Sequence, residues 1–125
     1  MTVGLALAVA LAGGLGAVCR FLLSAIIPTA TGSGFPWSTF VINVSGSFLV
    51  GLAAGYSAAH LLPVDVRLVI GTGFLGGYTT FSTASTDAVG LLRKRRPRVA
   101  ALYVFGTLAC ALTAAFVGMV LGLGV

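Results

Sequence analysis

Four long apolar segments, separated by prolines, most strongly limit what this chain can fold into. All four prolines lie between these segments, at Pro28, Pro36, Pro63 and Pro97. Proline is costly inside a helix and common beside its ends, and each segment reaches the roughly 20 residues that cross a bilayer core. The sequence therefore predicts an all-α membrane protein, a single domain over 1–125 with spans at roughly 2–27, 38–61, 66–92 and 99–124.

The composition excludes a soluble domain of this length. Of the 125 residues, 58% are hydrophobic and only 7% are charged, and the mean hydropathy is +1.13. A small soluble domain has too little interior to bury that much apolar surface. No basic residue precedes the first apolar segment, whereas a secretory signal normally carries one, so we expect this segment to be a retained span.

The third span changes character near its middle. A glycine pair, Gly76–Gly77, is followed by Phe81 among six hydroxyl residues, which are Thr79, Thr80, Ser82, Thr83, Ser85 and Thr86. Vicinal glycines weaken a helix, and hydroxyl groups can satisfy the backbone where it breaks. A broken span is tolerated only against other protein or a wet cavity. We therefore predict a break in the third helix that faces a partner or a pore.

Small and polar residues recur every four positions in three of the spans. Positions i and i+4 share one helix face, and a face of small residues lets another helix backbone approach closely. The members are Gly13 and Ala17 in the first span, Thr39, Asn43, Ser47, Gly51 and Gly55 in the second, and Gly106, Cys110, Ala114, Gly118 and Gly122 in the fourth. The pattern predicts tight helix packing.

The net charge of +5 is concentrated in one loop. Five of the seven basic residues lie within 93–98, directly between two apolar spans, which is typical of a cytoplasmic membrane-surface loop and not of a nucleic-acid site. Arg20 lies toward the same side, and only Arg67 lies toward the other. The positive-inside rule therefore predicts a cell-membrane protein with loop 93–98 in the cytoplasm and both termini outside.

Residues that could support catalysis are scarce. His60 stands alone near a span end, and Asp65 is most simply a helix N-cap for the third span. No carboxylate pair, metal-ligand spacing or nucleophile–base pair occurs in the sequence. Cys19 and Cys110 lie inside apolar segments, where packing thiols are common. The sequence predicts that the protein is not an enzyme.

Two polar residues within the spans each allow two interpretations. Asn43 either forms a hydrogen bond between helices or presents its amide to a polar path. Asp87 either pairs with Arg20 or lines a vestibule, and an ionisable residue within a span is a functional candidate by default. A narrow path lined by amide and hydroxyl donors suits a small anion, because such donors replace water without a fixed cation that would trap the ion.

Three blocks of the sequence resemble a known family. They are GGLGAVCR at Gly13–Arg20, STFVINVSGSFLVG at Ser38–Gly51 and GFLGGYTTFST at Gly73–Thr83. Together they are similar to the three signature blocks of the Fluc (CrcB-type) fluoride channels, and the similarity covers nearly the whole chain. The resemblance implies an antiparallel dimer of four-span subunits with two pores, which passes fluoride passively and lowers cytoplasmic fluoride.

The resemblance also implies roles for particular residues. Backbone carbonyls of Gly76 and Thr79 would hold a central structural sodium ion that is not transported, in line with the cation affinity of an unwound half-helix end. Phe81 would present its electropositive ring edge to fluoride. The pore and anion-binding positions would be Asn43, Phe81, Ser82, Thr83, Tyr103 and Asp87.

One position departs from the family pattern. Members usually carry a second phenylalanine three residues after the first, and here that position is Ala84. A homodimer would lack one ring in each pore, and the strong charge bias of the loops disfavours insertion in both directions. The sequence thus leaves a homodimer or a heterodimer open, and we favour a similar partner chain of opposite orientation.

Two other functions remain open from the residues. A small four-span multidrug exporter has a similar size, but the missing deep carboxylate in the first span argues against proton coupling. A structural partner subunit without its own pore would complete a dimer and conduct nothing. Replacing Asn43 or Phe81 would separate this last alternative from a conducting subunit.

Overall fold

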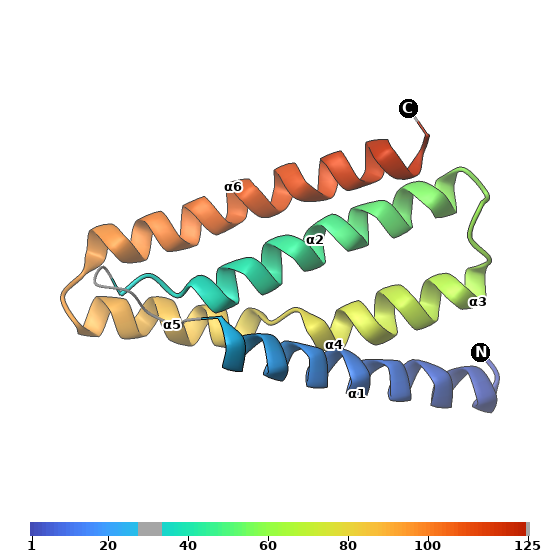
Figure 1. Ribbon diagram of the computed structural model, residues 1–125, viewed down its shortest axis with the longest axis horizontal. Coiled ribbons are helices and arrows are strands. Elements are labelled where there is room, and N and C mark those ends of the chain that lie inside the picture. The colour runs from blue at the N-terminus through green and yellow to red at the C-terminus, as the bar shows by residue number, and fades with distance from the viewer. Residues whose placement is uncertain (28–33, 125) are drawn as a thin grey trace.

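The computed structural model describes residues 1–27 and 34–124, and the ordered elements there are all helices (Figure 1). The predicted all-helical fold is confirmed for the described residues. In chain order the elements are α1 (Val3–Ile26), α2 (Trp37–Ala58), α3 (Val64–Arg67), the π-helix η1 (Leu68–Leu75), α4 (Gly76–Tyr78), α5 (Phe81–Arg93) and α6 (Pro97–Gly122).

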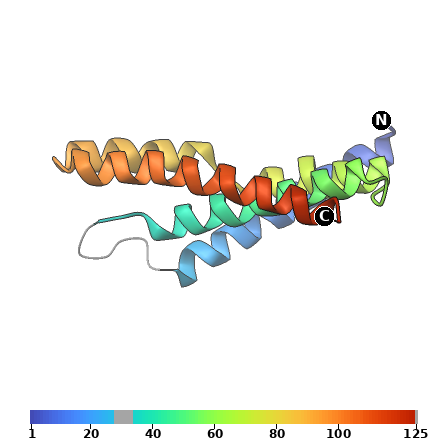
Figure 2. The ribbon, with the colours of Figure 1, turned by 90° about the horizontal axis from the view of Figure 1, so that it is seen from above.

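The helices run side by side along one long axis. The start of α1, the end of α6 and the connection between α2 and α3 lie at one end of the molecule, and the turn between α5 and α6 lies at the other (Figure 1). In both views α5 lies beside the first half of α6 (Figure 2). The basic residues around this turn are therefore gathered at one end.

Three helices are individually long and apolar enough to cross a membrane. These are α1, α2 and α6, with mean hydropathies of 2.0, 1.5 and 2.2 in their most apolar windows. Their outward faces are strongly apolar, with exposed side chains at i+4 spacing such as Leu7, Leu11 and Leu15 on α1. A surface of this kind is suited to lipid or to another apolar protein face.

Glycines bring α2 and α6 into backbone contact along one seam. A Cβ atom on Gly51 would overlap the carbonyl oxygen of Ala115, and one on Gly118 would overlap that of Phe48. Gly55 and Gly122 meet in the same way one turn further along, where an added Cβ on Gly55 would lie 2.8 Å from the Gly122 Cα. The predicted packing ridges are confirmed at these positions.

The predicted ridge makes no close helix contact in the first half of α6. A Cβ on Gly106 would meet nothing within 4 Å, and Cys110 is exposed. The two helices therefore make their closest contact only toward the end that holds the termini. Toward the other end α6 packs instead against α5.

Backbone contact also joins α1 to the segment formed by η1 and α4. A Cβ on Gly16 would overlap the Phe74 carbonyl oxygen, and one on Gly77 would overlap the Gly13 carbonyl oxygen. The predicted ridge on the first span is thus confirmed at Gly13. Within the glycine pair, Gly77 makes this close approach, whereas a Cβ on Gly76 would meet only the Gly71 carbonyl oxygen at 3.8 Å. Both glycines are helical.

The observed helix ends differ from the predicted spans by a few residues. Helix α2 ends at Ala58 instead of residue 61, because His60 adopts a positive φ of 58° that stops the helix. Helix α6 begins at Pro97, whose fixed φ suits a first helical position. The prediction that Asp65 is an N-cap is wrong, since Pro63 holds that position and Asp65 lies in the first turn of α3.

Candidate functional site

The third segment breaks at Thr79–Thr80. Helix α4 ends at Tyr78, and both following residues are extended, with ψ of 159° at Thr79 and 118° at Thr80. Helix α5 then begins at Phe81, capped by the Thr80 hydroxyl, which accepts a hydrogen bond from the Thr83 N–H at 3.2 Å. The predicted break is confirmed, and it lies one helical turn after the glycine pair.

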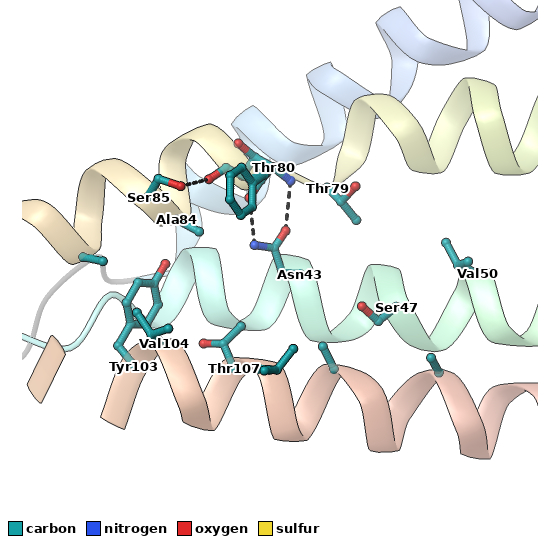
Figure 3. Close-up of a pocket in the computed structure, with 15 residues that line it drawn as sticks. Asn43, Ser47, Val50, Thr79, Thr80, Ala84, Ser85, Tyr103, Val104 and Thr107 are labelled. Carbon is teal, nitrogen blue, oxygen red and sulfur yellow. Dashed lines mark hydrogen bonds between the residues drawn. The ribbon is translucent and has the colours of Figure 1, made fainter. Parts of the chain in front are cut away.

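Asn43 on α2 holds the break with two hydrogen bonds. Its Nδ2 donates to the Thr80 carbonyl at 2.9 Å, and its Oδ1 accepts from the Thr80 N–H at 2.9 Å (Figure 3). Both backbone groups of Thr80 are therefore satisfied where no helical partner is available. The interhelical interpretation of Asn43 is confirmed, and its second Nδ2 hydrogen remains available because a primary amide has two.

Arg20 approaches the break from the opposite side. Its Nη1 donates to the Thr79 carbonyl oxygen at 3.4 Å, across 59 positions of the sequence. The Thr79 N–H and hydroxyl both donate to the Leu75 carbonyl, each at 3.0 Å. Side chains from α1 and α2 of the same chain therefore hold the two residues of the break in place.

A groove of about 710 Å³ runs beside the break, between α2, α5 and α6. Its polar groups are the Asn43 amide and several hydroxyls, and the rest of its lining is apolar (Figure 3). The lining residues are Asn43, Ser47, Val50, Thr79, Thr80, Phe81, Ala84, Ser85, Ala88, Tyr103, Val104, Thr107, Leu108, Ala111 and Ala115. Sparse donors in apolar walls are typical of a site that selects a small ligand.

The predicted site residues fall into three groups. Asn43, Thr79, Phe81 and Tyr103 line the groove. Asp87 lines a neighbouring cavity. Gly76, Ser82 and Thr83 line neither of these two cavities, and all three are exposed on the surface of the subunit.

Phe81 is the most exposed aromatic side chain near the groove. Phe81 is the first residue of α5, and 87% of its surface is exposed. Ala84, one turn further on, is partly buried and packs against the cluster formed by Phe35, Leu91, Ala100 and Tyr103. A ring that projects this far from the chain can contact another molecule across the groove.

Asp87 accepts hydrogen bonds from residues of α2 and α6. Its Oδ2 accepts from the Thr39 hydroxyl at 2.9 Å and from the Tyr103 hydroxyl at 3.3 Å. Arg20 donates to the break instead. The cavity that Asp87 lines has a volume of about 240 Å³ and includes Lys94 near the basic turn, which agrees with the vestibule interpretation of Asp87.

Sequence reasoning did not single out Thr107, which is one of the groove residues. The Thr107 hydroxyl oxygen is buried and has no hydrogen-bond partner among the described residues, although Thr107 lines the groove. A buried hydroxyl without a partner is unfavourable, and it is therefore a donor available to a ligand. The signal in the sequence was its position four residues after Tyr103, on the same face of α6.

The carbonyl groups at the break suit a cation chemically. The helical stretch from α3 to α4 ends at Tyr78, and the C-terminal end of a half-helix carries partial negative charge. The Thr79 carbonyl oxygen already accepts a hydrogen bond from the Arg20 guanidinium. Among the described residues no cluster of three or more His, Cys, Asp or Glu could hold a metal.

Comparison with known protein families identifies the family of this chain. The family described as CrcB-like protein, Camphor Resistance (CrcB), matches residues 7–119. The chain belongs to the CrcB-like family. With its three apolar helices, this family member is a multi-pass membrane protein.

Curated relatives match over nearly the whole chain. Fluoride-specific ion channel FluC 1 of Leifsonia xyli subsp. xyli is 48% identical, over 98% of this chain and 89% of its own length. A fluoride-specific ion channel FluC of Thermus thermophilus is 44% identical, over 93% of both chains. Fluoride-specific ion channel FluC 3 of Bifidobacterium longum is 47% identical, over 94% of this chain and 98% of its own length. The expected family is confirmed.

Proposed function

We propose that this CrcB-like chain is a subunit of a fluoride-specific channel that lets fluoride leave the cell passively. Its relatives are named as fluoride-specific ion channels, and these names also agree with the prediction that the chain is not an enzyme. The observation that carries the proposal is the groove beside the broken helix, where an amide and hydroxyls lie in apolar walls. Such donors can replace water around a small anion without binding it too tightly.

Each proposed pore residue, whether in the groove or beside it, contributes a distinct group to this function. The second N–H of Asn43 and the unpartnered hydroxyl of Thr107 are donors for the anion. Phe81 offers the positive edge of its ring, since the aromatic quadrupole leaves the edge electropositive. Ser82 and Thr83 extend the hydroxyl path along α5. Tyr103 and Asp87 form its end near the basic turn.

The groove needs a second subunit to become a closed pore. It lies open on one side of this subunit, and Phe81 projects from it with 87% of its surface exposed. An antiparallel dimer would cover both features. Because Ala84 replaces a second ring and the loops are strongly charge-biased, we infer a partner of similar four-span form inserted in the opposite direction, so that the channel is a heterodimer. A homodimer is the alternative.

The membrane topology and the central ion complete the proposal. The third segment, broken at Thr79–Thr80, would be the fourth crossing of the bilayer, with loop 93–98 in the cytoplasm and both termini outside. Backbone carbonyls of Gly76 and Thr79 would hold a structural sodium ion between the subunits. When bound, the ion would supply positive charge beside the break, where Arg20 already donates to the Thr79 carbonyl oxygen.

The test is fluoride efflux from loaded liposomes, measured with a fluoride-selective electrode. The chain is reconstituted alone and together with a similar four-span chain whose loops carry the opposite charge bias. We expect fluoride release without ATP or a proton gradient, retention of chloride, and much greater flux with the partner present. Robust flux from the chain alone would remove the heterodimer, and no flux in either preparation would refute the channel.

Two controls address the other functions. Proton-driven uptake of an organic cation would instead identify a multidrug exporter. A subunit without its own pore is the second candidate, and the replacement of a pore ring by Ala84 favours it. In that case Asn43→Ala or Phe81→Ala in the assembled channel would leave flux unaltered, whereas a conducting subunit would lose flux with either change.

A further inference from the structure

A cationic surface covers the turn between α5 and α6, at the end of the molecule away from the termini (Figure 1). Five exposed basic residues form this surface, which we call the basic turn, and they are Arg93, Lys94, Arg95, Arg96 and Arg98. The sequence has only two acidic residues. Asp65 lies in α3 at the opposite end, which leaves Asp87 as the one carboxylate near the turn. One carboxylate cannot neutralise five cations.

Backbone hydrogen bonds fix the shape of the basic turn. Helix α5 ends at Arg93, and two N–H groups beyond it donate back into its last turn. The Arg95 N–H donates to the Leu92 carbonyl at 3.0 Å, and the Arg96 N–H donates to the Leu91 carbonyl at 2.9 Å. This pair of bonds is the Schellman motif that commonly ends a helix. The basic side chains therefore extend from an ordered turn and not from a loose tail.

One residue of the turn is unfavourable for the fold itself. Arg95 has a positive φ of 58° and occupies the left-handed position of the Schellman motif, which is usually glycine. A side chain in this conformation is strained, and the Arg95 side chain is exposed. Backbone strain of this kind is found at functional positions. We therefore look for a role of Arg95 outside the chain.

An exposed tryptophan lies beside the basic turn. Trp37 is 42% exposed, and its ring centroid lies 4.5 Å from that of Phe35, which packs against Leu91 at the end of α5. A Cβ on Gly34 would lie 3.4 Å from Nη1 of Arg96, so the chain before α2 also meets the turn. Tryptophan is enriched where lipid headgroups meet the acyl chains. Trp37 therefore places the basic turn at the level of the headgroups.

Apolar side chains adjoin the basic turn on both helices. Leu92 on α5 is 56% exposed and Leu102 on α6 is 65% exposed. A phospholipid likewise joins apolar chains to a phosphate, and arginine binds phosphate with paired hydrogen bonds. We propose that the basic turn and Trp37 form a binding surface that selects anionic phospholipids over zwitterionic ones. This interaction is separate from fluoride conduction and does not depend on it.

Quenching of Trp37 by brominated lipids tests this proposal, because Trp37 is the single tryptophan. The full chain is reconstituted from detergent into phosphatidylcholine with increasing fractions of brominated phosphatidylglycerol, and into the converse mixture. The two quenching curves give the relative association constant of the two lipids beside Trp37. We expect about tenfold preference for phosphatidylglycerol at about 0.1 M salt. At about 1 M salt the preference should nearly vanish, because the Debye length falls from about 10 Å to about 3 Å.

Arg95→Gly is the sharpest variant, because glycine suits the positive φ and only the charged side chain is lost. The preference should fall by about threefold, while the thermal stability stays equal or rises. A combined variant with Lys94→Gln, Arg95→Gly and Arg98→Gln should bind both lipids equally. Arg95→Lys keeps the charge and should keep the preference. Arg67→Gln is the matched control, since Arg67 is an exposed cation in α3 at the opposite end.

A second measurement does not use Trp37. The chain is extracted with mild detergent from vesicles of equal phosphatidylglycerol and phosphatidylcholine content, and the retained phospholipid is quantified. We expect an excess of phosphatidylglycerol with the wild type and none with the combined variant. Both lipids are present in both leaflets of the vesicles, so a change in the direction of insertion cannot imitate this result.

Three outcomes would overturn the proposal. The first is a wild type that shows no preference for phosphatidylglycerol in either measurement. The second is a preference that the combined variant retains, or that Arg67→Gln reduces equally, since the effect would then not belong to the basic turn. The third is a preference that disappears when a similar four-span chain is co-reconstituted, because the surface would then be a contact between proteins.

Discussion

The α2–α6 seam and the Thr79–Thr80 break hold helices together in opposite ways. In the seam, Gly51, Gly55, Gly118 and Gly122 let the backbones touch, so that no side chain lies between them. At the break, the side chains of Asn43 and Arg20 reach across to backbone groups that have left the helix. The seam uses shape alone, whereas the break uses hydrogen bonds that must be satisfied in an apolar medium.

The difference shows how one small subunit combines rigidity with an open polar edge. The close packing of α2 against α6 is confined to the end that holds the termini, where added atoms would strike backbone. At the other end Gly106 meets nothing, α6 separates from this contact, and the groove opens beside the break. The proposed permeation path therefore lies where the glycine seam stops, and the seam fixes the position of α2 and α6, which line the groove.

The largest expected effect comes from adding one methyl group to the seam. Gly118→Ala would place a Cβ against the Phe48 carbonyl and 2.9 Å from the Leu52 backbone nitrogen, so that α2 and α6 must separate. We expect a loss of about 3 kcal/mol in the free energy of unfolding, measured by circular dichroism during thermal unfolding in detergent.

Gly106→Ala is the matched control for this change, because it lies in the same helix and its added Cβ meets nothing. It should be neutral or stabilising by up to about 1 kcal/mol, since alanine is the better helix former. Equal effects of both substitutions would show that the seam does not hold the two helices together.

Removing the amide at the break should have the next largest effect. Asn43→Ala leaves the N–H and the carbonyl of Thr80 without their partner, which should cost about 2 kcal/mol of stability and abolish fluoride flux. The measurements are thermal unfolding and hydrogen exchange at the Thr80 amide. Ser47→Ala, on the same helix and the same groove, should change stability by less than about 0.5 kcal/mol. An unchanged exchange rate at Thr80 in Asn43→Ala would contradict this role.

Much of the fold followed from the sequence because it depends on local patterns. Apolar length and proline positions predicted the helices, and small residues at i+4 spacing predicted the contact at Gly51 and Gly118. The break was predicted from the hydroxyl-rich stretch. The sequence did not distinguish a break at the glycine pair from one within the hydroxyl-rich stretch. In the structure both glycines are helical, and Gly77 packs against Gly13 of α1.

The partners within the site could not be predicted, because they depend on how distant helices are rotated about their axes. Asn43 and Thr80 are 37 positions apart, and Arg20 and Thr79 are 59 apart. The sequence also allowed Asp87 to pair with Arg20, but Asp87 accepts hydrogen bonds from Thr39 and Tyr103. Thr107 gave only a weak signal, since one threonine in an apolar helix is commonly bonded to its own backbone.

The smallest effect on stability is expected at Thr107, where removing the hydroxyl should favour folding but reduce fluoride efflux. Its hydroxyl oxygen is buried without a partner in the described part of the chain. Thr107→Val keeps the shape and removes the unsatisfied group, so the free energy of unfolding should stay equal or rise by less than about 1 kcal/mol. Fluoride efflux should nevertheless fall, because the anion loses a donor.

The control is Thr113→Val, which should leave efflux unchanged. The Thr113 hydroxyl donates to the Ala109 carbonyl at 2.8 Å, and Thr113 does not line the groove. A drop in stability without a drop in efflux would identify Thr107 as a packing residue. The groove at Thr107 would then contribute to packing, as the α2–α6 seam does, and not to anion binding.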